Sequence, residues 1–268
     1  MAEGNLLRYG VEGAVATIIL DNPARLNPLA IPLQHAMLAM LERVRADAAV
    51  RVLVITGAGR AFCVGADLTG MQGADASGKS LGDSTADIME TLSNPLIVAL
   101  REMPVPIVAS VNGPAAGAGV GLALSADVVV AARSAYFYLP FMTRLGIVPD
   151  LGTTWYVPRL IGRARATGLT LLGDRLPAEQ AAQWGLIWSC VDDDQLPAET
   201  LKIASRLAAL PGHAVAETRR VYDAAEASTL PQQLQFEADR QRELVNRDSF
   251  AEGVHAFLEK REPRFRGR

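Results

Sequence analysis

The sequence predicts an α/β core followed by a helical appendage, and three observations carry this prediction. The chain has 268 residues, which suits one large domain or one domain with an appendage. Short β-branched runs alternate with helix-like patterns over roughly the first 160 residues, as in α/β proteins with neighbouring parallel strands. Beyond that point the strand signals fade, and the remaining segments have helical spacing.

Short apolar runs rich in β-branched residues are predicted to be strands. Turn-forming glycine, proline, asparagine or aspartate residues follow the first three of them. The predicted strands are Val15 to Leu20, Arg51 to Thr56, Pro106 to Val111 and Asp127 to Ala132. Between them, apolar residues at helical spacing predict helices over Leu29 to Val44 and over Thr85 to Arg101.

The second half of the chain is predicted to be helical. Pro177 and Pro231 lie at positions that suit the first turn of a helix. The predicted helices are Arg163 to Leu172, Pro177 to Trp184, Ala198 to Leu210, Ala214 to Ala227 and Pro231 to Asn246. Earlier, Thr69 to Ser84 is rich in glycine, serine and aspartate. We expect it to be a long loop that either borders a site or is a dispensable surface segment.

Composition and charge exclude several classes of protein. Half of the residues are apolar and 21% are charged, so the chain can build a core and is not disordered throughout. A net charge of −3 gives no general attraction to nucleic acid or to an anionic membrane. There is no basic start followed by an apolar run and no long uninterrupted apolar stretch, which favours a soluble, cytoplasmic protein. Two cysteines without a CxxC pair, and no HExxH, argue against a metal site.

Two glycine-rich segments, 57–68 and 117–122, each follow a predicted strand. As dinucleotide-binding motifs both fail, because Phe62 and Leu122 stand where the third glycine of GxGxxG would be. Neither contains a P-loop lysine, and the chain has no GxSxG nucleophile elbow. Both can expose backbone N–H groups, the second at the start of a helix predicted over Gly119 to Ala126. They are therefore candidates for an oxyanion hole, the alternative being tight packing that requires small side chains.

Several segments together carry a resemblance to a known family. They are Asp21 to Asn27, Thr56 to Leu68, Val111 to Ala126, Leu145 to Pro158, Leu172 to Arg175 and Phe257 to Pro263. In order and spacing the sequence resembles the crotonase (enoyl-CoA hydratase/isomerase) superfamily over nearly its whole length. Its second half looks most like the phenylacetate-catabolism branch, whose members isomerise 1,2-epoxyphenylacetyl-CoA to the oxepin-CoA.

The resemblance implies a fold, an assembly and a substrate class. Residues 1–195 would form the crotonase spiral of repeated strand–strand–helix units, and residues 196–268 a helical trimerisation region. The expected partners are an acyl-CoA thioester and further copies of the chain, in a trimer or a dimer of trimers. Neither nucleic acid, membrane, metal nor a separate cofactor is implied, since coenzyme A arrives as part of the substrate.

The resemblance also implies roles for individual residues. The backbone N–H groups of Ala66 and Ala118 would form the oxyanion hole that holds the thioester carbonyl oxygen. Arg25 and Leu26 would contact coenzyme A on one side of its path, and Ala66, Asp67 and Leu68 would contact it on the opposite side. Phe257 and Lys260, in the last helix of a neighbouring subunit, would also contact it.

The departures from the hydratase pattern point to an isomerase. The two glutamates of family hydratases would align with Gly121 and near Phe141, so neither carboxylate is present. Asp150 remains, at the position of the acid/base in isomerase branches; without the resemblance, the N-cap of a helix beginning near Gly152 would be the favoured role. Candidates for an apolar wall beside it, which are otherwise ordinary core residues, are Phe141, Leu145, Trp155 and Tyr138.

The favoured reading is thus a CoA-thioester isomerase with one aspartate base. A 2-enoyl-CoA hydratase and a non-catalytic acyl-CoA-binding or RNA-binding relative are the alternatives. Three further residues are interpreted structurally. Asp67 is expected to accept hydrogen bonds that organise its loop, Asp127 to lie at a strand entry, and Cys63 to be a small buried apolar residue.

Overall fold

The computed structural model describes residues 6–70, 78–265 and 267, and its framework is a six-stranded sheet. The strand order is β1-β2-β3-β4-β6-β9. β1 pairs antiparallel with β2, and all other neighbours are parallel. The bounds are Leu7–Glu12 (β1), Val15–Leu20 (β2), Val52–Gly57 (β3), Ile107–Val111 (β4), Val128–Ala132 (β6) and Ser189–Val191 (β9). The four predicted strands are present within one residue at each end.

The strands that the sequence did not reveal are short or poorly patterned. In β1 only Leu7 is buried, so its run lacks the alternation of a half-buried strand. A second sheet has the order β5-β7-β8, with strands of two or three residues that leave almost no periodic signal. They are Ala115–Ala116 (β5), Tyr136–Tyr138 (β7) and Leu176–Pro177 (β8). β5 matters for the site, because it leads directly into the second glycine-rich loop.

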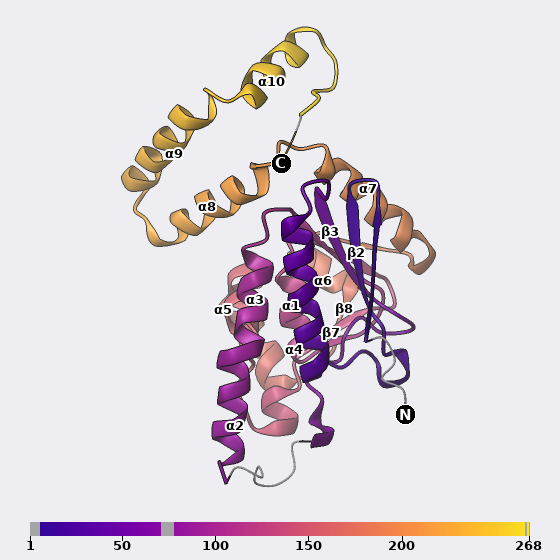
Figure 1. Cartoon of the computed structure of the whole chain (residues 1–268). Helices are drawn as coiled ribbons and strands as arrows, with labels where there is room; N and C mark the ends of the chain where they lie inside the picture. Colours follow the sequence, from indigo (N-terminus) through magenta and orange to yellow (C-terminus); the bar gives the residue numbers. More distant parts are fainter. Residues whose placement is uncertain (1–5, 71–77, 266, 268) are drawn as a thin grey trace.

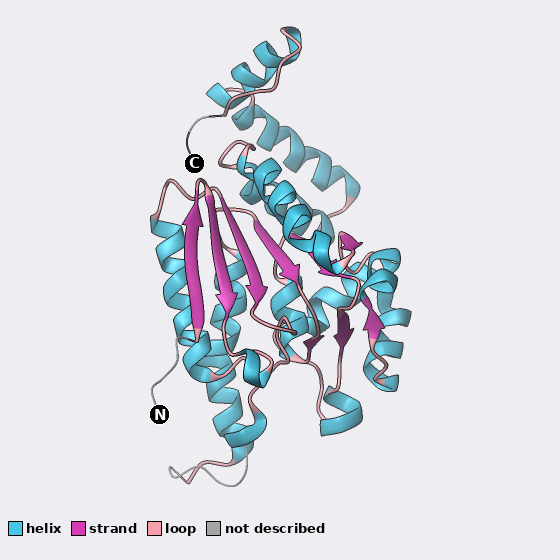
Figure 2. Ribbon diagram, turned by 90° about the vertical axis from the view of Figure 1, so that its right-hand side faces the viewer, coloured by secondary structure: helices cyan, strands magenta, loops and turns pink. Residues whose placement is uncertain are grey.

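Helices cover the sheets, as Figure 2 shows. Their bounds are Ile31–Ala46 (α1), Leu81–Ile88 (α2), Asn94–Arg101 (α3), Ala118–Leu124 (α4), Thr153–Leu172 (α5), Ala178–Trp184 (α6) and Leu196–Ala208 (α7). The single helix predicted over Thr85 to Arg101 is instead α2 and α3 joined by a π-helical turn, Met89–Ser93. Of the predicted loop from Thr69 to Ser84, residues 71–77 lie outside the described residues, and α2 begins before its expected end.

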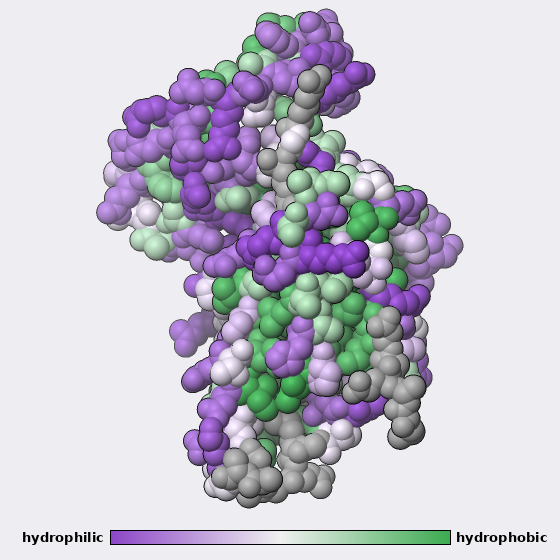
Figure 3. Space-filling model, viewed as in Figure 1, coloured by the Kyte–Doolittle hydropathy of each residue, from purple (hydrophilic) through white to green (hydrophobic). Residues whose placement is uncertain are grey.

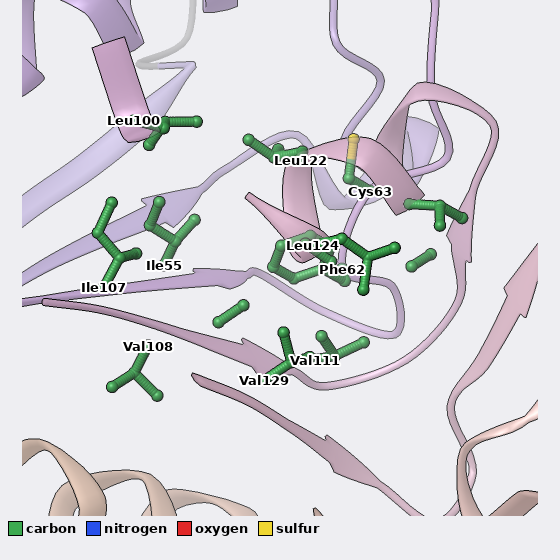
Figure 4. Close-up of a cluster of buried hydrophobic side chains, with 14 of the residues drawn as sticks. Ile55, Phe62, Cys63, Leu100, Ile107, Val108, Val111, Leu122, Leu124 and Val129 are labelled. Atoms are coloured by element: carbon green, nitrogen blue, oxygen red, sulfur yellow. The ribbon is translucent and has the colours of Figure 1, made fainter. Parts of the chain in front are cut away.

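The core lies between the parallel strands and the helices packed on them. Figure 4 shows Phe62, Val111 and Val129 in one buried hydrophobic cluster with Leu124, the last residue of α4. Cys63 is fully buried, and burial raises the pKa of its thiol to about 12, which confirms the expected apolar role. The side chains of the first glycine-rich segment, Phe62 and Cys63 among them, are therefore packed into the core.

The last three helices form an arm that projects from the body in Figure 1. They are Ala214–Ala227 (α8), Leu230–Leu244 (α9) and Asp248–Leu258 (α10). Helix α7 packs against β3, β4 and β6, so the arm begins after the boundary expected at residue 195. The buried Arg219 side chain ties α8 to the body, donating to both Asp127 carboxylate oxygens and to the carbonyls of Arg101 and Met103. Asp127 also accepts from the N–H of Ile107, which confirms its structural role.

Candidate active site

A cavity of about 440 Å³ lies where the two glycine-rich loops meet, near the start of α1. The side of the body seen in Figure 3 is richer in hydrophobic residues than the projecting arm. The cavity is lined mainly by apolar residues, with a few polar groups among them. They are Leu29, Ala30, Ile31, Pro32, Gln34, Val64, Ala66, Asp67, Leu68, Thr69, Thr85, Ile88, Met89, Ser93, Gly117, Ala118, Pro140, Phe141, Leu145, Ile147, Asp150 and Leu151.

The two glycine-rich loops are held against each other by backbone contacts. The carbonyl of Cys63 accepts from the N–H of Ala116 at 2.9 Å. Gly65 has a φ of +89°, and a Cβ there would lie 2.8 Å from the Ala116 carbonyl oxygen and 3.0 Å from the Ala118 nitrogen. Only glycine allows this backbone conformation and this approach. The consequence is that Ala66 and Ala118, one from each loop, line the same cavity.

Backbone N–H groups of both alanines are free to bind a ligand. Ala118 is the first residue of α4, so its N–H has no partner within the helix. In the part of the chain that the structure describes, neither N–H donates to another group. Two unpaired donors in one cavity are the arrangement that an oxyanion hole requires. The geometry thus supports the oxyanion reading of these loops, in addition to the tight packing that was its alternative.

Asn27 fixes the first loop from the other side. It is fully buried, and its amide donates to the carbonyls of Ala58, Ala61 and Phe62. Its side-chain oxygen accepts from the N–H of Asn22. A buried amide with its hydrogen-bonding capacity used in this way rigidifies the segment before Ala66.

Asp150 lines the same cavity, and the structure rules out its alternative role as a helix cap. Helix α5 begins at Thr153, its N-cap is Gly152, and no side chain caps it. Only the backbone carbonyl of Asp150 accepts from the N–H of Thr153. The carboxylate atom Oδ1 is buried and without a hydrogen-bond partner within the described residues. Burial raises the pKa of Asp150. A carboxylate with a buried, unpaired oxygen and a raised pKa is typical of a catalytic base.

The raised pKa predicts how Asp150 affects stability. Because its folded pKa lies above its unfolded value, the native state binds more protons than the unfolded state as pH rises through this interval. As pH rises from the unfolded to the folded pKa of Asp150, stability is therefore lost. Below the unfolded pKa the carboxyl is protonated in both states, and this destabilising contribution is absent. We expect Asp150→Asn to be at least as stable as the wild type at neutral pH, with the difference vanishing in acid where the protein stays folded. Urea unfolding at several pH values measures this, and a less stable variant at neutral pH would contradict it.

Gly121 explains how the turn carrying Asp150 approaches α4. A Cβ at this position would lie 2.1 Å from the Leu151 carbonyl oxygen and 3.1 Å from Thr153 Oγ1. Leu151 and Gly152 themselves have positive φ values of 46° and 75°. A glutamate at Gly121 therefore has no room unless the turn moves.

The expected coenzyme A contacts are only partly brought together. Arg25 donates two 2.8 Å hydrogen bonds to the Asp67 carboxylate, and the same guanidinium contacts Thr69. These bonds lower the pKa of Asp67 to about 2, so the pair persists at all but strongly acidic pH. Asp67 also accepts from the Thr69 N–H, which confirms that it organises its loop. Leu68 lines the cavity beside Ala66 and Asp67, whereas Arg25 and Leu26 do not.

Phe257 and Lys260 lie on the distal arm. Phe257 is 83% exposed near the end of α10. Lys260 is not helical as expected, since α10 ends at Leu258 and Lys260 has a φ of +55°. Within one chain the structure does not bring either residue to the cavity.

Two of the four expected wall residues are in place and two are not. Phe141 and Leu145, from the π-helical turn Phe141–Leu145, line the cavity. Trp155 does not, because its ring packs against the guanidinium groups of Arg159 and Arg101, 4.2 and 5.7 Å from its centroid. Tyr138 is also outside the lining, and its hydroxyl is paired with Arg144 at 3.4 Å. Its backbone carbonyl still serves the site by accepting from the N–H of Gly117.

Gln34 and Ser93 were missed by the sequence analysis. Both are buried and line the cavity. Gln34 occupies the inward face of α1 together with Leu33, Met37 and Leu41. A polar residue on an otherwise apolar face was the signal that could have identified it. Within the described residues, no group of three or more His, Cys, Asp or Glu side chains could hold a metal ion, and no helix is long and apolar enough to cross a membrane.

Comparison with known proteins identifies the family. The enoyl-CoA hydratase/isomerase family matches residues 10–268. The chain is 44% identical over 260 residues to a 1,2-epoxyphenylacetyl-CoA isomerase of Escherichia coli, covering 96% of this chain and 97% of that protein. It is 43% identical to a probable enoyl-CoA hydratase of Rhodobacter capsulatus, covering 98% of each. A crystal structure of an enoyl-CoA hydratase from Polaromonas has a TM-score of 0.89 at 33% identity, covering 97% of this chain and 99% of that one. The chain therefore belongs to the enoyl-CoA hydratase/isomerase family and has the crotonase fold, as its resemblance predicted.

Proposed function

We propose that this protein is an acyl-CoA isomerase in which Asp150 is the only acid/base. The single observation that carries the proposal is the Asp150 carboxylate, whose Oδ1 atom is buried and has no hydrogen-bond partner within the described residues, in the same cavity as the free N–H groups of Ala66 and Ala118. A family whose members act on CoA thioesters supplies the substrate class. The chain is similar to a 1,2-epoxyphenylacetyl-CoA isomerase, and we therefore propose, more specifically, that the acyl group is an aromatic one such as epoxyphenylacetyl, or a fatty acyl group.

The reaction follows from these groups. The two N–H donors bind the thioester carbonyl oxygen, whose negative charge grows as the adjacent carbon loses a proton. The Asp150 carboxylate takes that proton, and the electron pair of the broken C–H bond passes into an enolate. The protonated carboxyl then returns the same proton to a carbon two positions along, and the double bond shifts. One base suffices because the proton removed is the proton returned.

The hydratase alternative needs two groups, one to activate water and one to handle the carbon-bound proton. The positions that would supply them are Gly121, where a side chain has no room, and Phe141, which is a hydrocarbon. Relatives named as probable hydratases are therefore a guide to the family and not to the chemistry of this cavity.

Product identification tests the proposal. The protein is offered cis-3-enoyl-, trans-2-enoyl- and 1,2-epoxyphenylacetyl-CoA, and products are followed by mass and absorbance. We expect at least one product of unchanged mass, as isomerisation requires. Products heavier by one water from the trans-2-enoyl thioester, without isomerisation of the others, would establish a hydratase instead.

Coenzyme A contacts and assembly remain part of this proposal. Arg25, Leu26, Ala66, Asp67 and Leu68 would follow the coenzyme A chain. Phe257 and Lys260 would reach it only from another copy, since they lie on the arm. The arm exposes several large apolar side chains, which are Tyr222, Leu230, Leu234, Phe250, Phe257 and Leu258. Burying them against copies in a trimer or dimer of trimers fits their exposure.

Light scattering measures this assembly. We expect the mass of three or six chains at micromolar concentration, because an arm with so much exposed apolar surface is poorly stabilised alone. A monodisperse monomer would contradict it. A cytoplasmic location also stays a prediction.

A further inference from the structure

Gln34 and Ser93 form a buried polar pair in the wall of the cavity. Gln34 is 5% exposed and Ser93 is 4% exposed, and both residues line the cavity. Gln34 comes from α1, and Ser93 is the last residue of the π-helical turn Met89–Ser93. Such π-turns are rare and occur often at functional sites. Apolar neighbours in the lining, Pro32 and Ile88 among them, make this pair a distinct polar spot.

The orientation of the Gln34 amide is fixed by its partners. The Nε2 group donates to the Leu29 carbonyl at 3.0 Å, and that carbonyl can only accept. The Oε1 atom therefore faces Ser93, whose hydroxyl donates to it at 2.7 Å. Leu29 in turn donates its N–H to the Gly65 carbonyl at 2.7 Å, beside Ala66. The pair is thus anchored to the first glycine-rich loop, and a flipped amide would lose the bond to Leu29, because two acceptor oxygens would then face each other.

Within the described residues, this arrangement leaves one donor of the Gln34 amide unused. A glutamine amide has two N–H bonds, and a single one is committed to Leu29. The Ser93 hydroxyl proton is committed to Oε1, so the serine oxygen has only acceptor capacity left. A buried N–H without a partner is costly. If the pair were purely structural, there would be no reason for this unpaired N–H to lie in the wall of a ligand cavity.

We propose that the free N–H of Gln34, held in place by Ser93, binds an acceptor oxygen in the acyl group of the substrate. The substrate class is then an acyl-CoA whose acyl part carries an ether, epoxide or carbonyl oxygen, in preference to a plain hydrocarbon chain. This inference rests on the proposed function, because it takes the cavity to hold an acyl group. A site that hydrogen-bonds a substrate atom rejects the analogue that lacks it, since its own polar group is then left unpaired.

Matched thioesters test this without turnover. The probes are cyclohexylacetyl-CoA and the three tetrahydropyranylacetyl-CoA isomers, in which one ring methylene is replaced by oxygen. Calorimetry gives the affinity ratio of each oxygen isomer to the carbocycle for the wild type and for Gln34→Met. For at least one isomer we expect this ratio to be about tenfold higher in the wild type, as one buried hydrogen bond provides.

Two further variants separate recognition from folding. Ser93→Ala keeps the bond from Gln34 to Leu29 but frees Oε1, and we expect it to lower the same ratio about threefold. Ser110→Ala is the matched control, because Ser110 is also buried and hydrogen-bonded, to Thr200 at 2.8 Å, but does not line the cavity. Its ratio should equal that of the wild type.

The outcomes are distinct. Wild-type ratios for all isomers in both Gln34→Met and Ser93→Ala would overturn the inference, as would an equal loss of affinity for the carbocycle and the oxygen isomers. Failure of every thioester to bind the wild type would overturn the proposed function along with it. Binding without coupling to Gln34 overturns this inference alone.

Discussion

Replacing Asp150 by asparagine is expected to reduce kcat by about 10²- to 10⁴-fold, the range typical for loss of a general acid/base. Asparagine keeps the size of the side chain but cannot take a proton. Thioester affinity should survive, since the N–H groups of Ala66 and Ala118 are untouched. The measurement is kcat on the best isomerisation substrate together with the Kd of a saturated thioester, which we expect to change less than about threefold.

Asp192→Asn is the control for this substitution. Asp192 is an exposed carboxylate paired with Arg133, outside the lining of the cavity, so removing its charge should leave kcat unchanged. If Asp150→Asn kept nearly wild-type activity, the single-base mechanism would be wrong. The oxyanion hole alone would then have to drive a substrate-assisted rearrangement.

Much of the body was predictable because burial on both faces makes parallel strands into apolar runs. β3 and β4 are such runs, and the predicted strands match them within a residue. Helix α8 begins and ends at the predicted residues, Ala214 and Ala227. The short strands β5 and β7 were not predicted, because two or three residues cannot show a period.

Only those parts of the site could be predicted that show a local sequence pattern or match the family's motifs. Glycine-rich loops after strands indicated exposed N–H groups. Nothing in the periodicity showed that Oδ1 of Asp150 is buried without a partner within the described residues, or that Leu151 and Gly152 after it have positive φ values. Trp155 was only a candidate for the apolar wall, with ordinary core packing as the alternative. Its ring is instead covered by two arginines, from α3 and α5, a contact that a sequence does not reveal.

Gly121→Ala is expected to cause the second large loss of activity, although Gly121 does not line the cavity. The added Cβ would lie 2.1 Å from the Leu151 carbonyl oxygen, so α4 and the turn must separate. Overpacking of this kind costs about 1–3 kcal/mol of stability. A misplacement of the base by about 1 Å can cost up to about 10²-fold in rate, and we expect kcat to fall by at least about tenfold. Kinetics at a temperature where circular dichroism shows the variant folded separates the two effects.

Gly168→Ala is the matched control, since Gly168 also lies within a helix, α5, but no heavy atom would lie within 4 Å of its Cβ. It should gain about 0.5–1 kcal/mol of stability and keep its kcat. Wild-type kcat in Gly121→Ala would show that close approach of α4 does not position Asp150. The same contact predicts that Gly121→Glu does not create a hydratase. The longer side chain meets the same carbonyl at its first carbon, so a carboxylate gained at Gly121 displaces the one at Asp150.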